Sequence, residues 1–138
     1  MEANVKTVMH ECSMLSDKGR ISFGEVVGRL AGAGVERYHA DLAAAGKTYY
    51  LPDGSAERVH GTALAREPAE LFSAADVEAA IRAIQAGAIK YREFCERIAS
   101  AGCVGYLVSI VGKRAVYYGR SGDLHVEWFP GAQPSGAP

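Results

Sequence analysis

The feature that most constrains the fold is an internal repeat with a period of 68 residues. When residues 19–54 are aligned without gaps to residues 87–122, eleven of the 36 positions are identical. The matches are Gly19/Gly87, Ile21/Ile89, Glu25/Glu93, Arg29/Arg97, Ala31/Ala99, Ala33/Ala101, Gly34/Gly102, Tyr38/Tyr106, Tyr49/Tyr117, Tyr50/Tyr118 and Gly54/Gly122. Unrelated segments of ordinary composition share far fewer residues. The chain is therefore predicted to contain two similar units packed with pseudo-twofold symmetry.

Each unit begins with a pattern typical of two helices. Residues 4–16 place apolar side chains on one helical stripe that ends before Gly19. Ser22 and Glu25 then have the spacing of a capping box, and Gly34 is predicted to end the second helix. The second unit repeats this order with a helix start near Ser73, a break at Gly87 and an end at Gly102.

A β-hairpin is predicted to follow the helices in each unit. Tyr38, Ala40 and Leu42 alternate with polar residues, and Tyr106, Val108 and Ile110 repeat that alternation. Gly46 is predicted to turn the first hairpin and Gly112–Lys113 the second. The predicted class is α+β, an internal duplication of a helix–helix–β-hairpin unit, with an antiparallel sheet and helices packed on one face.

Two units are too few for a solenoid, which needs at least three. We therefore predict a single α+β domain over residues 1–130, made of repeats at about 4–66 and 73–130. Residues 131–138 are small and rich in Gly and Pro, and are predicted to form a disordered tail.

Charge and the N-terminal sequence bear on partners and location. The formal net charge is -1 and the pI is about 6.4, without the basic excess typical of proteins that bind nucleic acid or anionic membranes. Glu2, His10 and Glu11 interrupt the apolar positions near the N-terminus, unlike a signal peptide or membrane span. The expectation is a cytoplasmic protein with no nucleic-acid or membrane partner.

The three cysteines are predicted to be buried, reduced thiols. They are odd in number and lack CxxC spacing. On the repeat alignment Cys95 faces Val27, Cys103 faces Val35, and Cys12 falls opposite Ile81 if one gap is allowed. Positions that accept an aliphatic residue or Cys are packing positions.

Some polar and aromatic residues recur in both units. Glu25 with Arg29, like Glu93 with Arg97, has the spacing of a helix-surface ion pair, although two such pairs across the pseudo-twofold would also suit an anion or a partner. The repeated tyrosines are interpreted as sheet residues that pack a ring and bond a hydroxyl. The alternative interpretation is that some of these tyrosines line a groove between the units and contact a ligand.

The candidate functional residues are polar residues that the repeat does not share: Arg120, His125, Glu127, Tyr118, His39 and Asp41. Tyr118 is the exception, a repeated residue included for its position near Arg120. His125 and Glu127 alternate onto one strand face, where they suit two metal ligands or a base with its orienting carboxylate. The competing interpretation is a polar outer face on the last strand. Because two ligands do not make a metal site, no metal and no cofactor is predicted.

The sequence also resembles a known family. The segments AAIRAIQAGAIKYREFCERIASAGCVGY, GKRAVYYGRSGDLHVEWFP, GVERYHADLAAAGKTYYLPDG and FSAADVEAAI are similar to an uncharacterised family of small bacterial proteins. Its members carry a domain-of-unknown-function label and are sometimes called phage envelope protein-like, and some occur in prophages. The resemblance extends from about Val5 to Pro130 and implies no reaction, cofactor or catalytic residue.

Three functions follow as expectations. The first is a small cytoplasmic binding module, without catalytic activity, that uses the cleft between its units for a small molecule or a protein. The second is an enzyme acting through Arg120, His125 and Glu127. The third is a phage-derived assembly protein that self-associates through an exposed sheet edge, with a homodimer as the corresponding state.

Overall fold

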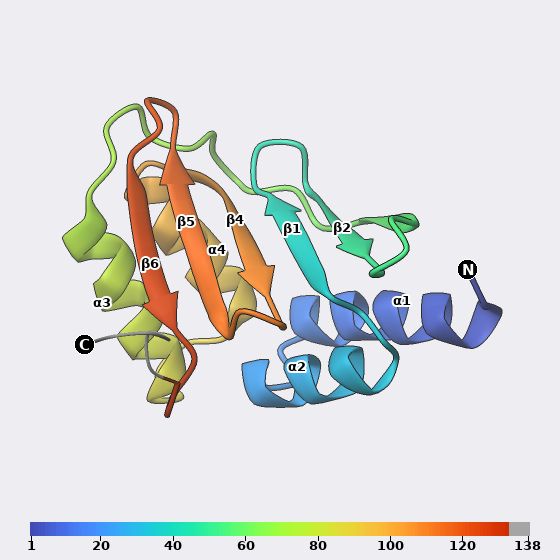
Figure 1. The fold of residues 1–138 in the computed structure, drawn as a ribbon. Coiled ribbons are helices and arrows are strands. Elements are labelled where there is room, and N and C mark those ends of the chain that lie inside the picture. Colours follow the sequence, from blue (N-terminus) through green and yellow to red (C-terminus); the bar gives the residue numbers. More distant parts are fainter. Residues whose placement is uncertain (133–138) are drawn as a thin grey trace.

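Two units of helix, helix and three strands follow one another along the chain (Figure 1). The computed structural model describes residues 1–132, so residues 133–138 of the predicted tail lie outside the described part. The first unit contains α1 (Ala3–Asp17), α2 (Phe23–Gly32), β1 (Arg37–Asp41), β2 (Gly46–Tyr50) and β3 (Ala56–His60). The second contains α3 (Ala74–Gln85), α4 (Tyr91–Ser100), β4 (Cys103–Ser109), β5 (Arg114–Gly119) and β6 (Leu124–Trp128).

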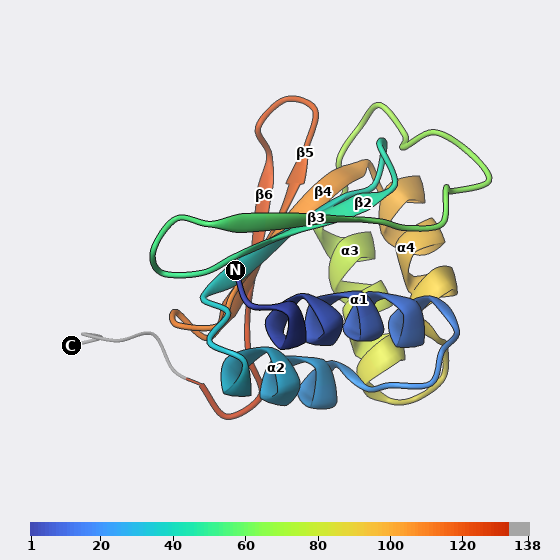
Figure 2. The same ribbon diagram turned by 90° about the vertical axis from the view of Figure 1, so that its right-hand side faces the viewer.

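The strands of residues 1–132 form one antiparallel sheet in the order β3-β2-β1-β4-β5-β6. The helices of this part of the chain lie on one side of it (Figures 1 and 2). The predicted α+β class is therefore confirmed. Each predicted hairpin is extended by a third strand, and the two units join where β1 pairs with β4.

The pairing of β1 with β4 locates the pseudo-twofold axis. Arg37 pairs with Ser109, His39 with Leu107, and Asp41 with Gly105. Because His39 and Leu107 are themselves equivalent at the 68-residue shift, the register is symmetric about this pair. The axis therefore passes between His39 and Leu107, at the centre of the sheet.

The backbone repeats at the same shift. Positive φ angles occur at Gly19 and Gly87 (67° and 74°), Gly34 and Gly102 (86° and 87°), Gly54 and Gly122 (89° and 81°), and Ala45 and Lys113 (both 53°). The first two pairs confirm the predicted helix ends, and the third places a left-handed glycine shortly before β3 and β6. The fourth pair is the last residue of a four-residue turn in each hairpin, 42–45 and 110–113. Gly112–Lys113 thus lie in the second turn as predicted, whereas Gly46 begins β2 instead of turning the first hairpin.

Gly46 and Gly112 have side chains close to where a Cβ would stand. A Cβ at Gly46 would lie 2.7 Å from a guanidinium nitrogen of Arg58. A Cβ at Gly112 would lie 2.8 Å from the hydroxyl of Ser109, which accepts a hydrogen bond from the Gly112 amide. The strain of a left-handed Ala or Lys, about 1–2 kcal/mol, is tolerated because the flanking strands are fixed by the sheet.

Local signals at the helix starts are confirmed. Ser22 Oγ accepts from the Glu25 amide, and Glu25 accepts from the Ser22 amide, so the capping box forms. Ser73 caps α3 in the same way through the Asp76 amide. The predicted ion pair is present in α4, where Arg97 bonds Glu93 at 2.8 Å. In α2 the capping box engages Glu25 instead.

The core lies between the sheet and the helices. Tyr38 and Tyr49 are buried with ring centroids 5.2 Å apart, and their equivalents Tyr106 and Tyr117 repeat this contact at 5.2 Å. Leu30 of α2 and its equivalent Ile98 of α4 are fully buried above them. Four of the six repeated tyrosines therefore belong to the core.

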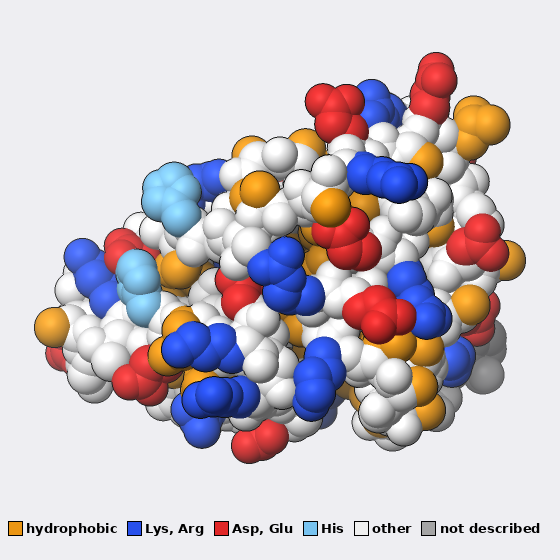
Figure 3. Space-filling model, turned by 180° about the vertical axis from the view of Figure 1, so that it is seen from behind, with side chains coloured by type: hydrophobic (Ala, Val, Ile, Leu, Met, Phe, Trp, Pro, Cys, Tyr) orange, Lys and Arg blue, Asp and Glu red, His pale blue; other side chains and the backbone are white. Residues whose placement is uncertain are grey.

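The outer surface of the molecule, seen from behind the view of Figure 1, mixes acidic and basic side chains without a large patch of one sign (Figure 3). Within residues 1–132, none of the helices is long and apolar enough to cross a membrane.

Candidate functional site

The six residues singled out in the sequence occupy three separate places. His39, Asp41 and Tyr118 lie on the face of the sheet that no helix of residues 1–132 covers, which we call the open face. One row of this face runs across the six strands: Arg58, Thr48, His39, Leu107, Val116 and Val126. His39 Nε2 lies 2.8 Å from the Tyr118 hydroxyl, and the Asp41 carboxylate accepts from the Ala44 amide at 2.9 Å.

The pKa shifts of this open-face group favour uncharged side chains. Burial lowers the pKa of His39, partly opposed by Asp41 and reinforced by Arg58. Burial also raises the pKa of Tyr118. Both groups therefore favour their neutral forms near pH 7, and the group forms a hydrogen bond on a flat surface.

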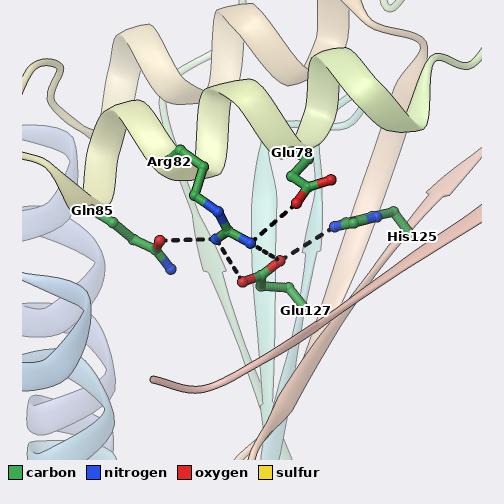
Figure 4. Close-up of polar contacts among 5 residues, drawn as sticks. All are labelled: Glu78, Arg82, Gln85, His125 and Glu127. Carbon is green, nitrogen blue, oxygen red and sulfur yellow. Dashed lines mark hydrogen bonds and ion pairs between the residues drawn. The ribbon is translucent and has the colours of Figure 1, made fainter. Parts of the chain in front are cut away.

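His125 and Glu127 lie on the other face, against α3 (Figure 4). His125 pairs with Tyr117 and Glu127 with Ala115, and both partners are buried beneath the helices. The interpretation as a polar outer face is therefore wrong: Leu124 and Val126 occupy the open face and are 60% and 42% exposed. Strand alternation shows which residues share a face, but not which face the helices cover.

The contacts of Glu127 tie β6 to α3. Arg82 donates to both carboxylate oxygens, at 2.8 and 3.3 Å, and also pairs with Glu78 at 3.2 Å. His125 lies 3.3 Å from the same carboxylate. Burial acts to raise the pKa of Glu127, but the bonds from Arg82 and His125 outweigh it and the pKa is lowered.

The first unit also ties its edge strand to its first helix, through a pair whose equivalents in the second unit, Glu78 and His125, bond Arg82 and Glu127 instead of each other. His10 of α1 bonds Glu57 of β3 at 2.9 Å. At the 68-residue shift His10 corresponds to Glu78 and Glu57 to His125. Both units thus have polar contacts that hold their edge strand against their first helix. A structural role therefore explains the cluster in Figure 4.

Arg120 has a different environment again. It lies in the turn after β5 and donates to the Pro68 carbonyl at 2.6 Å, which anchors the segment connecting the two units. The six candidates thus do not converge on one pocket.

The cysteines are buried, as predicted. Burial raises the pKa values of Cys95 and Cys103 to about 11, so both thiols stay protonated. The gap proposed for Cys12 is unnecessary: the buried residues of α1 and α3 coincide at a shift of 68, which places Cys12 opposite Ala80 and Ser13 opposite Ile81.

A pocket between the units contains a residue that the sequence interpretation missed, Lys47. The pocket has a volume of about 40 Å³. Its walls come from α1, the β1–β2 hairpin, residues 61–64 and α4. It shares Ser13, Asp17, Gly61, Thr62 and Arg92 with a wider groove at the surface.

Lys47 is only 8% exposed. Its ammonium nitrogen lies 4.4 Å from the centre of the Tyr91 ring. Within residues 1–132 no carboxylate lies within ion-pair distance of it, and no hydrogen-bond acceptor is found for it. Burial lowers the pKa of Lys47, against the influence of Cys95, Asp17 and Cys12.

The Tyr91 hydroxyl is engaged elsewhere, at 2.6 Å from the Tyr106 hydroxyl. Burial holds the pKa of both phenols well above its ordinary value. The amine of Lys47 is therefore the reactive group that faces the pocket without a partner.

The equivalent place in the second unit is filled. Lys47 corresponds to Ala115, and Gly61 corresponds to Phe129. The Gly61 amide donates to the Ala45 carbonyl as the Phe129 amide donates to that of Lys113, so the backbones match. Phe129 packs edge-on against Phe23 at 5.2 Å. Because residue 61 is a glycine, the first unit has no ring at this place and the pocket stays open.

The 68-residue repeat contains the information from which the Lys47 pocket could have been predicted. Lys47 shares its strand face with buried Tyr49, and it is a polar residue whose counterpart is Ala115. Comparing unlike positions in the two units, as was done for His39 and Arg120, would have found it.

Comparison with known proteins adds a partial family match. Residues 65–127 match the family described as protein of unknown function (DUF1398), less than half of the chain. No curated protein matches the sequence. The matched segment is nearly the whole second unit and includes Tyr91 and Cys95 but not Lys47. No activity is indicated by the match. Within the part of the chain that the structure describes, no three His, Cys, Asp or Glu side chains are grouped to hold a metal ion.

Proposed function

We propose that the chain is a small-ligand-binding module whose site is the Lys47 pocket. The observation that carries this proposal is Lys47 itself, a nine-tenths buried residue in the pocket wall whose amine has no ion-pair partner within residues 1–132 and is not sealed from the pocket. Burying a charged group without a partner opposes folding by several kcal/mol unless it becomes neutral. The second unit shows that Ala is compatible with the same backbone, which favours a role for Lys47 other than packing.

The size and lining of the pocket limit the ligand. A volume of about 40 Å³ accommodates a group of only a few non-hydrogen atoms. The walls combine the Tyr91 ring with Ser13 and Thr62 hydroxyls. This combination suits a small polar molecule, or a small polar group at the end of a ligand that continues along the surface groove.

The test is a titration followed by amide NMR. Labelled protein is mixed with acetamide, ethylene glycol, acetate and inorganic phosphate, each at millimolar concentration. We expect at least one probe to shift the amide resonances of Lys47, Gly61 and Cys95 in a saturable manner. The variant Gly61→Phe restores the ring of the second unit and is expected to abolish these shifts.

A matched control separates filling of the pocket from a general effect of an added ring. Val111→Phe places the same ring in an exposed turn of the second unit. It should leave the shifts unchanged. Absence of saturable shifts for every probe, or their persistence in Gly61→Phe, would contradict the proposal.

Self-association is a second candidate, supported by the open face. Leu124 and Val126 are well exposed there, next to the partly exposed Val116 and Trp128 on the same face. Burying such side chains against a second copy gains about 25 cal/mol per Å². Light scattering after size-exclusion chromatography tests this: a dimer that Val126→Asp converts to a monomer supports it, and a monomer at all concentrations contradicts it.

The enzyme alternative has no comparable support. Arg120, His125 and Glu127 have separate structural contacts, so we propose no reaction for them.

A further inference from the structure

We infer that Lys47 is a nucleophilic amine that captures a small uncharged aldehyde as an imine inside the pocket. This inference rests on the proposed function, because the aldehyde must enter the same pocket. It adds the chemical class of the ligand and a covalent step.

The geometry around Lys47 leaves its nitrogen available. An amine that is ion-paired or hydrogen-bonded is held in its protonated form or has its lone pair occupied. Lys47 has neither kind of partner within residues 1–132, and its nitrogen lies 4.4 Å from the centre of the Tyr91 ring. The pocket reaches the surface groove through Gly61 and Thr62, which gives a small molecule access.

The groups facing Lys47 from each surrounding element keep the pocket free of competing nucleophiles. Burial raises the pKa of Cys12 on α1, and of Cys95 and Tyr91 on α4, so these groups remain protonated near pH 7. Burial lowers the pKa of Lys47 itself. At a given pH, Lys47 therefore has a larger fraction of free amine than an exposed lysine.

The charges of the lining favour an uncharged ligand. The ionisable residues that line the pocket, apart from Lys47, Tyr91 and Cys95, are Asp17, Asp41, Arg92 and Glu96. Three are acidic and one is basic, so the lining disfavours anions even beside a protonated Lys47. A small aldehyde brings no charge and fits the available volume.

The step is balanced without any oxidant or reductant. The Lys47 lone pair attacks the carbonyl carbon, a C–N bond forms, and the carbonyl electron pair moves to oxygen. A proton passes from nitrogen to that oxygen to give a carbinolamine. Loss of water then breaks the C–O bond and forms C=N, and hydrolysis reverses the sequence and returns the aldehyde.

The experiment uses acetaldehyde and sodium cyanoborohydride at pH 7, with peptide mapping by mass spectrometry over time. The hydride traps an imine as a stable alkylated lysine. We expect Lys47 to be labelled severalfold faster than the exposed Lys18 and Lys113, since a lowered pKa leaves more of its amine free. These surface lysines are internal references in the same molecule, so this comparison needs no variant.

Two variants sharpen the result. Lys47→Arg keeps a cation but cannot form an imine, and should lose the fast adduct. Gly61→Phe keeps Lys47 but closes the pocket, and should slow its labelling at least about tenfold, with Val111→Phe as the control that labels normally. Labelling of Lys47 at or below the rate of Lys18 and Lys113 would overturn the inference.

The inference and the proposed function can fail separately. If the NMR titration gives saturable shifts at the pocket but Lys47 is not labelled preferentially, the imine is rejected and noncovalent binding stands. If neither signal appears, both are rejected.

Discussion

The two units differ in the side chains at one equivalent place. It lies where the first helix and second strand of a unit meet the second helix of the other unit. In the second unit this place is apolar: Ala115 lies on the strand, Ile81 on α3, and the ring of Phe129 packs on Phe23. In the first unit the corresponding positions hold Lys47, Ser13 and Gly61. The backbone is the same at both places, down to the left-handed residues Ala45 and Lys113.

This difference separates what the fold needs from what one unit has added. The apolar version shows that the scaffold closes without a lysine, a hydroxyl or a pocket. The polar version retains a largely buried lysine whose amine has no ion-pair partner within residues 1–132, a group that gives the fold little stability in return for its desolvation. Proteins commonly keep such destabilising groups where they act on a ligand. The first unit is therefore the one in which a site is expected.

The largest effect is expected from two equivalent glycines whose surroundings differ. Gly34 and Gly102 both have positive φ, but a Cβ at Gly34 meets open space, whereas one at Gly102 would lie 2.1 Å from the Leu71 carbonyl oxygen. We expect Gly102→Ala to cost about 4 kcal/mol or prevent folding, and Gly34→Ala only about 1–2 kcal/mol from backbone strain. Urea unfolding of the two variants measures the difference, and equal losses would show that the connecting segment does not pack as described.

Two core residues test the part that the units share. Leu30 and Ile98 are equivalent and fully buried. Leu30→Ala and Ile98→Ala should each lower the free energy of unfolding by about 3 kcal/mol, through lost burial and a cavity. If one variant proves neutral in urea unfolding, the two helices do not play equivalent roles in the core.

Substitutions at Cys95 and His125 test whether a buried packing position matters more for stability than a helix-to-strand contact. Cys95→Ser places a hydroxyl on the buried face of α4 and should cost about 1–2 kcal/mol. His125→Ala removes a 3.3 Å contact while Arg82 still holds Glu127, and should cost less than about 1 kcal/mol. Thermal melts rank the two, and an equal or larger loss for His125→Ala would contradict this assignment.

The smallest effect concerns the residue pair at the pseudo-twofold axis. The pKa of His39 is lowered in the folded state, so the unfolded chain binds a proton more readily. Stability from this group is present above the ordinary pKa of about 6.5 and is lost as the pH falls through the folded value. His39→Leu copies Leu107 and should reduce the fall in melting temperature between pH 7 and 5. An unchanged pH profile would show that His39 does not contribute.

Local patterns predicted the helices and strands well because their causes are local. The capping box at Ser22 and the glycine helix ends depend on neighbouring residues alone. The repeat added the pairing of units, which no local signal contains. The turn of the second hairpin was predicted at Gly112–Lys113 and includes both, whereas Gly46, predicted to turn the first hairpin, is the first residue of β2.

The candidate site could not be predicted in the same way. Alternation placed His125 with Glu127 but could not say that α3 covers their face. Arg120 stands out in the sequence, although its partner is a carbonyl 52 residues away. The pocket depends on the absence of a side chain at Gly61 as much as on Lys47, and an absence becomes visible only against the filled equivalent at Phe129.

The most direct test of the account is the stability of Lys47→Met, which keeps an unbranched apolar side chain up to the ε position and removes the amine. Because the second unit packs this place without a charge, we expect the free energy of unfolding at pH 7 to be unchanged or to rise by up to about 2 kcal/mol. The same variant should lose ligand-dependent NMR shifts. A loss of more than about 1 kcal/mol, with binding retained, would show that Lys47 serves the fold through its contact with Tyr91 and would contradict the account.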